Sequence, residues 1–164
     1  TRLGLSADNV SGRVGASLGP IAGILLIVGA GGGFKQTLVD SGIASIIATW
    51  IQQAAVPALL AGWLVAVAVR LATGSATVAT ITAAGIMAPL ASHMPQTEVA
   101  LLVLAIGAGS VFLSHVNDAG FWLVKEYFGM TVGQTFKTWS LMETILSVVA
   151  MATISLLALA LGVL

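Results

Sequence analysis

The chain has 164 residues, of which 58% are hydrophobic and 7% are charged, and its formal net charge is +0 at pH 7. Soluble domains carry about 25% charged residues, so this chain has too little polar surface to cover itself in water. The balanced charge excludes a basic face for nucleic acid. The absence of cysteine excludes disulfides, thiolate metal sites and a cysteine nucleophile. We therefore predict an all-α integral membrane protein.

The first part of the chain predicts a loop followed by a membrane-spanning segment. Residues 1–15 lack the charged and then apolar regions of a signal peptide. We expect them to be a loop cut out of a longer protein, ahead of a membrane portion over residues 16–164. No charged residue occurs between Arg13 and Lys35, and a helix needs about 20 apolar residues to cross a bilayer. The first span is therefore predicted at about residues 16–34.

Two short apolar segments follow within about residues 56–91, and they flank a stretch rich in glycine, serine and threonine. The first runs from Pro57 to Arg70 and the second from Val78 to Leu90, and each is short for a full crossing. Such a pair predicts a re-entrant helical hairpin, whose non-helical tip must line a cavity or be buried in protein. The alternative is a pair of full spans with Arg70 at an aqueous turn.

The sequence Ser-His-Val-Asn-Asp at residues 114–118 interrupts the next apolar run, within about residues 98–124, and flanking glycines predict a broken helix. An ionisable residue at membrane depth costs about 2.5–3.5 kcal/mol, which makes Asp118 a functional candidate. If the break follows Asp118, His115 lies on the same helical face, and the two are the parts of a proton relay. The alternative is a hydrated loop that satisfies its own backbone as an Asx turn.

The last predicted span covers about residues 141–164, where Glu143 is the only charged residue. We place Glu143 at the membrane interface or in a pair with Lys137, and the alternative is a buried role. Trp63, inside the first hairpin arm, is predicted to pack against a neighbouring helix. Tryptophan favours the headgroup region, so three others are predicted interface anchors: Trp50, Trp122 and Trp139.

Lysine and arginine near the predicted span ends indicate the orientation of the chain. If the first span runs outwards, Arg2, Arg13, Lys125 and Lys137 lie on the cytoplasmic side, while Lys35 lies outside. This arrangement obeys the positive-inside rule. We therefore expect a multi-pass protein of the cytoplasmic (inner) membrane.

Three stretches together resemble the C-terminal part of the gluconate permease family: GAGGGFKQTLVDSGI, GSATVAT and SHVNDAGFWLVKEYF. The resemblance runs from about Ser17 to the end of the chain and covers roughly the last third of such a transporter. Members of the family are proton-coupled symporters for sugar acids. The resemblance implies one of two inverted repeats, with about three transmembrane helices, a re-entrant hairpin and a broken helix that meet at the substrate.

The resemblance also implies a substrate site between the hairpin tip and the unwound segment. The implied tip residues are Gly74, Ser75 and Thr77, and the implied residues of the unwound segment are Ser114, His115, Asn117 and Asp118. Hydroxyls of Ser75 and Thr77 would bind the carboxylate of a small hydroxylated monocarboxylate. Asn117 and Ser114 would bind its hydroxyls.

Uptake of the coupled proton is assigned by the resemblance to Asp118 together with His115. Arg70 is either a counter-charge to the substrate or the end of a hairpin arm. The expected partners are protons, the monocarboxylate, the lipid bilayer and the remaining N-terminal part of the transporter, with a homo-oligomer left open. No metal, cofactor or nucleic acid is expected.

The sequence also bears on three other functional classes. A structural or accessory membrane subunit would use its glycines for helix packing, and it would tolerate alanine at the predicted site residues. A membrane-embedded enzyme is disfavoured, because Ser114 next to His115 does not make a nucleophilic triad and no HExxH or cofactor fingerprint occurs. A channel is disfavoured because nothing resembles a repeated carbonyl or charge-ring filter.

Overall fold

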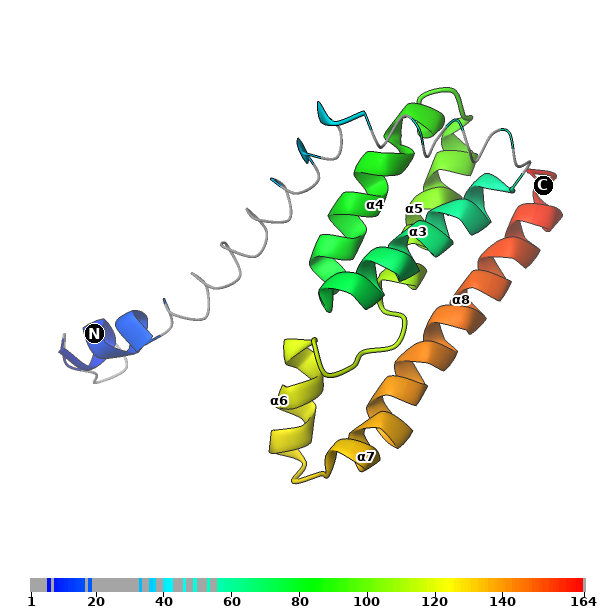
Figure 1. Ribbon diagram of the computed structural model, residues 1–164. Helices are drawn as coiled ribbons and strands as arrows, with labels where there is room; N and C mark the ends of the chain where they lie inside the picture. The colour runs from blue at the N-terminus through cyan, green and yellow to red at the C-terminus, as the bar shows by residue number, and fades with distance from the viewer. Residues whose placement is uncertain are drawn as a thin grey trace.

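The computed structural model describes residues 56–163 continuously, together with residues 8–16 and scattered single positions or short stretches before residue 56. Within these described parts every regular element is helical and there is no strand, as expected for an all-α protein. Figure 1 shows the order of the elements. They are α3 (Ala58–Thr73), α4 (Ala76–Ala91), α5 (Gln96–Ser110), α6 (Ala119–Tyr127), α7 (Val132–Thr135), the π-helical segment η1 (Phe136–Ser140) and α8 (Leu141–Ala160).

Residues 8–16 form a helix, so the prediction of a loop over 1–15 is wrong for this stretch. The cause is an N-cap at Ser6, whose hydroxyl accepts a hydrogen bond from the Asn9 amide at 3.3 Å. The Ser6 carbonyl also accepts from the Val10 amide at 3.1 Å. The predicted span at about residues 16–34 falls almost wholly outside the described residues.

Helices α3 and α4 are antiparallel neighbours joined by Gly74 and Ser75 (Figure 1). Gly74 has φ +70°, a left-handed conformation that favours glycine, and its amide donates to the Arg70 carbonyl at 2.8 Å. Ser75 then caps α4, since its hydroxyl accepts from the Val78 amide at 3.3 Å. Each helix has 16 residues, which corresponds to about 24 Å, whereas a bilayer core is about 30 Å thick.

The apolar core lies where α3 packs on α4 and α5, and where α5 packs on α8. The ring of Trp63 packs edge-on against Phe112, with ring centroids 5.8 Å apart, which confirms that Trp63 packs against a neighbour. Its indole nitrogen donates to the Ser147 hydroxyl at 3.1 Å. Ser147 in turn donates to the Ala108 carbonyl at 2.6 Å. These bonds satisfy the Trp63 indole and the Ser147 hydroxyl and tie α3, α5 and α8 together.

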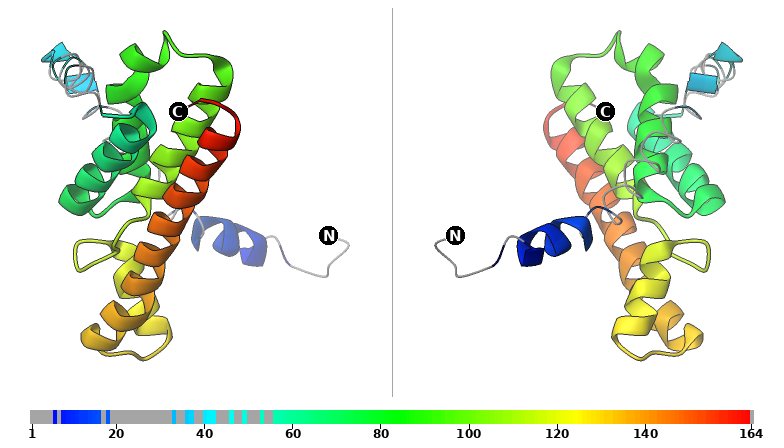
Figure 2. Two further views of the ribbon diagram at one scale, coloured as in Figure 1. Left: turned by 90° about the vertical axis from the view of Figure 1, so that its right-hand side faces the viewer. Right: turned by 90° about the vertical axis from the view of Figure 1, so that its left-hand side faces the viewer.

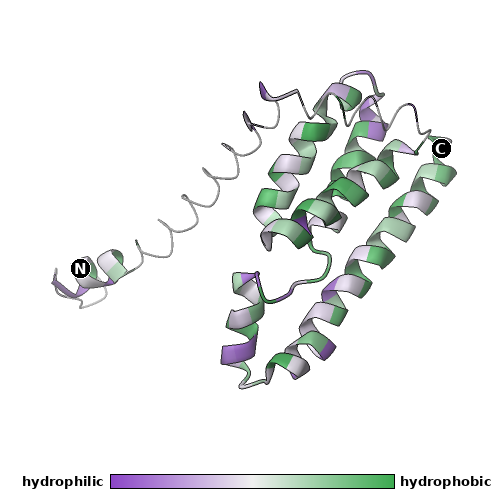
Figure 3. Ribbon diagram, in the orientation of Figure 1, coloured by the Kyte–Doolittle hydropathy of each residue, from purple (hydrophilic) through white to green (hydrophobic). Residues whose placement is uncertain are grey.

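The last helix is longer than the predicted span of about residues 141–164. A continuous helical run covers Val132–Ala160, 29 residues that include α7 and η1, and it is the one helix in the described residues that is long and apolar enough to cross a membrane. It extends further towards the N-terminus because Thr131 and Gln134 form a capping box. Only 22% of the most apolar 18-residue stretch of this run is buried inside the protein. Figure 3 shows that apolar residues dominate α8.

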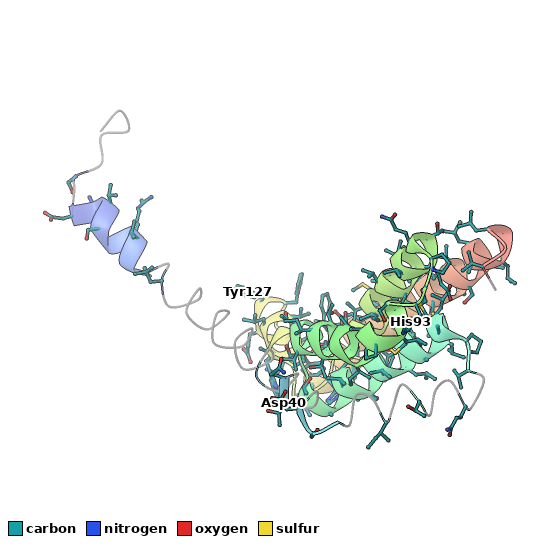
Figure 4. The ribbon with its side chains drawn as sticks, turned by 90° about the horizontal axis from the view of Figure 1, so that it is seen from above. Asp40, His93 and Tyr127 are labelled. Atoms are coloured by element: carbon teal, nitrogen blue, oxygen red, sulfur yellow. The ribbon has the colours of Figure 1, made fainter. Side chains whose placement is uncertain are left out.

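The turns at the two ends of the bundle contain exposed residues. His93 lies in the turn between α4 and α5 and is exposed (Figure 4). Tyr127, at the end of α6, is 85% exposed (Figure 4). The α4–α5 turn and the α6–α7 turn lie at opposite ends of the molecule along α8 (Figures 1 and 2).

We predict that Gly109→Ala weakens the packing of α3 on α5. A β-carbon at Gly109 would lie 2.5 Å from the Trp63 carbonyl oxygen and 2.9 Å from the Ala66 β-carbon. Since the first neighbour is backbone, the helices must separate, and overpacking of this kind costs about 1–3 kcal/mol. A lower Tm of the full-length protein in detergent is expected.

Gly107→Ala is the matched control on the same helix, because a β-carbon there meets nothing within 4 Å. Its Tm should be unchanged or slightly higher, since alanine favours the helix over glycine. Equal Tm values for Gly107→Ala and Gly109→Ala would contradict the close approach of α3 and α5.

Candidate functional site

The connector between α5 and α6, residues 111–118, has no regular helix. Leu113 has a positive φ of +43°, a strained conformation for a branched side chain. The Asp118 amide donates to the His115 carbonyl at 2.8 Å. Asp118 itself is the N-cap of α6, and its Oδ1 accepts from the Gly120 amide at 2.8 Å. The break therefore precedes Asp118, and the condition for placing His115 and Asp118 on one helical turn is not met.

Asp118 lies at the centre of a polar cluster. Its Oδ2 is 2.5 Å from Arg70 Nη2, and the same oxygen accepts a short hydrogen bond from the Ser114 hydroxyl. Ser114 is fully buried, and its carbonyl accepts a short hydrogen bond from the hydroxyl of Ser140. The connector is thus fastened on one side to α3 and on the other to η1.

Arg70 is the cation of this cluster, and its side chain is only 4% exposed. Its Nη1 donates to the Gly74 carbonyl at 2.6 Å, and its Nη2 is also 3.6 Å from Glu143 Oε2. Arg70 is thus buried in protein rather than exposed at its turn, while the choice between a hairpin and two full spans stays a prediction. The guanidinium instead joins the α3–α4 turn, the connector and α8.

Two residues of the last helical run lie at or beside this cluster, Glu143 and Trp139. Glu143 lies near Arg70, as in its buried alternative, rather than in a pair with Lys137, and its side chain is 14% exposed. Trp139 has a buried indole nitrogen, and its role as an interface anchor stays a prediction. The two are four positions apart, so they face the same way on a helix. That spacing is the sequence signal that could place Trp139 and Glu143 at one site.

The turn and the connector also touch directly. Asn117 Nδ2 donates to the Leu71 carbonyl at 3.1 Å. A β-carbon at Gly74 would lie 2.6 Å from the Asn117 carbonyl carbon, so only glycine allows this approach. The predicted tip and the predicted unwound segment are therefore neighbours in space.

A cavity of about 520 Å³ opens between these elements. Its walls are residues 74–78, residues 117–120, Arg70, Trp139 and Glu143. Gly74, Ser75, Thr77, Asn117 and Asp118, all predicted site residues, line it. Two are absent from the walls: Ser114 lies behind Asp118, and His115 makes no side-chain hydrogen bond or ion pair within the described residues.

The helix ends around the cavity add to its electrostatic character. The N-termini of α4 and α6 both contribute wall residues. Free amide groups and the helix dipole make such ends favourable for anions. Buried ionisable groups enclosed by apolar helices are typical of membrane proteins that move ions or polar solutes.

The chain belongs to the GntP family of permeases, whose profile matches residues 1–160. It is therefore a membrane protein of a transport family. It is 55% identical over 158 residues to a gluconate permease of Pseudomonas aeruginosa, covering 96% of this chain and 35% of that protein. It is 50% identical over 145 residues to the high-affinity gluconate transporter of Escherichia coli K12, covering 88% of this chain and 33% of that protein.

A third relative differs in its named substrate. The Gnt-II system L-idonate transporter of Escherichia coli K12 is 47% identical over 150 residues, which cover 92% of this chain and 34% of that protein. The chain spans about a third of the length of the curated relatives it matches. No solved structure matches the chain.

Arg70→Gln is expected to destabilise the full-length protein strongly. The substitution leaves Asp118 and Glu143 close together without a cation, and removing one partner of a buried ion pair costs about 3–5 kcal/mol. Thermal unfolding in detergent measures the loss. Arg13→Gln, at an exposed position of the helical stretch 8–16, is the control and should leave Tm unchanged.

The double variant Arg70→Gln/Asp118→Asn distinguishes the contribution of the ion pair to stability from the contribution of side-chain packing. It removes one of the two unpaired carboxylates, so it should be more stable than Arg70→Gln alone. A double variant as unstable as the sum of both single variants would show that the pair has no coupling energy.

Proposed function

We propose that this chain is the C-terminal part of a secondary active transporter that takes up gluconate or a related sugar acid together with protons. The observation that carries the proposal is the cavity, which one buried guanidinium and two helix N-termini line inside an apolar helical protein. The relatives named as gluconate and L-idonate transporters support a sugar acid as the substrate. The proposed location is the cytoplasmic membrane, crossed several times.

The proposed membrane arrangement follows from helix lengths. Helices α3 and α4 are each short for a crossing, and we propose that they enter and leave on the same side as a re-entrant hairpin. Helix α5, the connector and α6 form a broken span, while α8 crosses fully. The α6–α7 turn then lies on the cytoplasmic side and the α4–α5 turn on the outer side, in agreement with the positive-inside rule.

The substrate carboxylate is proposed to bind where positive potential is concentrated. Ser75, Thr77 and the first turn of α4 line the cavity, and their hydroxyls and amides are the proposed donors to the carboxylate, with Gly74 allowing close approach of the backbone. The Asn117 amide borders the same space and suits the substrate hydroxyls. Ser114 is better suited to hold Asp118 than to touch substrate, because it is fully buried and donates to that carboxylate.

Charge balance supplies the proposed reason for proton coupling. Arg70, Asp118 and Glu143 together carry one positive and two negative charges when both carboxylates are ionised. A bound monocarboxylate adds a third negative charge in an apolar setting, where excess charge is expensive. Uptake of a proton by Asp118 restores the net charge that the cavity has before the monocarboxylate binds. His115 has no place on the cavity wall, which favours Asp118 alone as the carrier.

Asp118→Asn in the full-length transporter tests this assignment. Asparagine can still cap α6 and accept from Ser114, but it cannot take up the proton. Labelled gluconate uptake into membrane vesicles should lose its dependence on an imposed proton gradient, while exchange of internal for external gluconate continues.

Two variants serve as controls for Asp118→Asn. Asp8→Asn changes an exposed carboxylate in the helical stretch 8–16, and His115→Gln removes the other predicted proton carrier. Both should keep gradient-driven accumulation. Wild-type coupling in Asp118→Asn would remove Asp118 from the proton role. Unaltered transport after alanine substitution at Ser75, Thr77, Asn117 and Asp118 would favour a structural subunit instead.

A further inference from the structure

Unpaired polar atoms are concentrated on the wall of the cavity. In the described part of the chain, the buried side-chain nitrogen and oxygen atoms without a hydrogen-bond partner are Arg70 Nε, Thr82 Oγ1, Trp139 Nε1 and Glu143 Oε2. Three of these residues line the same cavity, and Thr82 is the exception. Because buried polar groups are nearly always hydrogen-bonded, three atoms without a hydrogen-bond partner on residues that line one cavity point to a ligand that binds there.

The chemistry of the three atoms restricts the ligand. Arg70 Nε and Trp139 Nε1 only donate, so each needs an acceptor oxygen. Glu143 Oε2, as part of a carboxylate, only accepts, so it needs an O–H or N–H donor. A carboxylate carried on a hydroxylated chain supplies acceptor oxygens and hydroxyl donors within one small molecule.

We propose that Arg70, Trp139 and Glu143 form a recognition site for a hydroxylated monocarboxylate, with Trp139 and Glu143 as its specificity-determining residues. The N–H groups of Arg70 and Trp139 donate to ligand oxygens, and Glu143 accepts from a ligand hydroxyl. This inference rests on the proposed transport of sugar acids and names contacts for that same cavity. It adds two residues that the family motifs in the sequence do not include.

Glu143 also explains how a second carboxylate would be rejected. A hydroxyl placed at Glu143 gains a hydrogen bond, whereas a carboxylate at the same place meets a like charge. Arg70 does not cancel this repulsion, because its Nη2 is already 2.5 Å from Asp118 and lies 3.6 Å from Glu143. The site therefore distinguishes sugar monoacids from sugar diacids and from carboxylates without hydroxyls.

The local helix geometry places the two specificity residues together. Trp139 belongs to the π-helical segment η1, and Glu143 follows on the first turn of α8. Short π-helical segments within α-helices are frequent at functional sites. Here Ser140 also fixes the segment to the connector, through its bond to the Ser114 carbonyl. The indole and the carboxylate thus have defined positions relative to Asp118.

The test uses purified full-length protein and its transport in vesicles. Trp139→Phe removes the indole N–H but keeps an aromatic ring, and Glu143→Gln removes the charge but keeps an acceptor. Gluconate binding is measured by equilibrium binding of radiolabelled gluconate and by the shift in Tm that gluconate causes. Competition is measured with glucarate, a sugar diacid, and with hexanoate, which lacks hydroxyls.

We expect Trp139→Phe to raise the Kd and KM for gluconate about tenfold, the effect of losing one hydrogen bond to a charged group, with little change in maximal rate. Glu143→Gln should weaken gluconate binding and make glucarate a better competitor relative to gluconate. A merely structural role for Glu143 would lower the amount of folded protein without changing this preference.

Matched controls have the same chemical changes away from the cavity. Trp122→Phe alters an indole that is 41% exposed and donates to the Val116 carbonyl. Glu126→Gln alters a side chain that is 72% exposed and pairs with its neighbour Lys125. Both controls should retain wild-type Kd values and the wild-type order of competitors.

The outcomes separate this inference from the proposed function. If wild-type protein neither binds nor transports gluconate or idonate, the proposed function fails and the recognition site fails with it. If wild-type protein transports gluconate but Trp139→Phe and Glu143→Gln keep its affinity and selectivity, only the recognition site is overturned. If Glu143→Gln shows no cooperative melt, it is not folded, and the Kd of Trp139→Phe then tests the recognition site. A wild-type Kd in Trp139→Phe overturns it.

Discussion

The architecture depends on one buried ion pair, between Arg70 on α3 and Asp118 on the connector, with an Nη2–Oδ2 distance of 2.5 Å. Taking both charges out of water is costly, and the cost is offset only when the remaining donors and acceptors are satisfied. That condition explains the hydrogen bonds from Ser114 and the Gly120 amide to Asp118, and from Arg70 to Gly74. A non-helical connector within an apolar bundle is tolerated because this cluster supplies its polar contacts.

Local sequence signals were sufficient for the turn between α3 and α4, where Gly74 adopts its left-handed conformation and Ser75 caps the next helix. They located the interruption before α6 only to the stretch between two glycine-containing segments. They did not show that Asp118 is the N-cap of α6. These signals act within one helical turn, so they could be interpreted without knowing the fold. The same reasoning missed the helix over residues 8–16, although Ser6 is a good N-cap.

The partners of the charged residues could not be predicted in this way. Arg70 and Asp118 are 48 positions apart, and only the packing of α3 against α5 and of the connector against α3 brings them together. Sequence proximity offered only Lys137 as a partner for Glu143, whereas the packing places it near the guanidinium of Arg70. Composition alone shows that the few charges are expensive in lipid, but it does not show which of them share a site.

The way Arg70 is bound determines how an anion can approach it. Its Nη1 is held by the Gly74 carbonyl and its Nη2 by Asp118, so the free edge of the guanidinium is at Nε. In the proposed mechanism, an incoming carboxylate adds to the cluster rather than replacing Asp118, so that three negative groups surround one cation. The Coulomb energy of that arrangement is unfavourable at the low dielectric of a membrane protein interior. Neutralising one carboxylate with a proton is the smallest change that removes the excess charge. On this proposal, the geometry that recognises the substrate is also the reason for binding a proton with it.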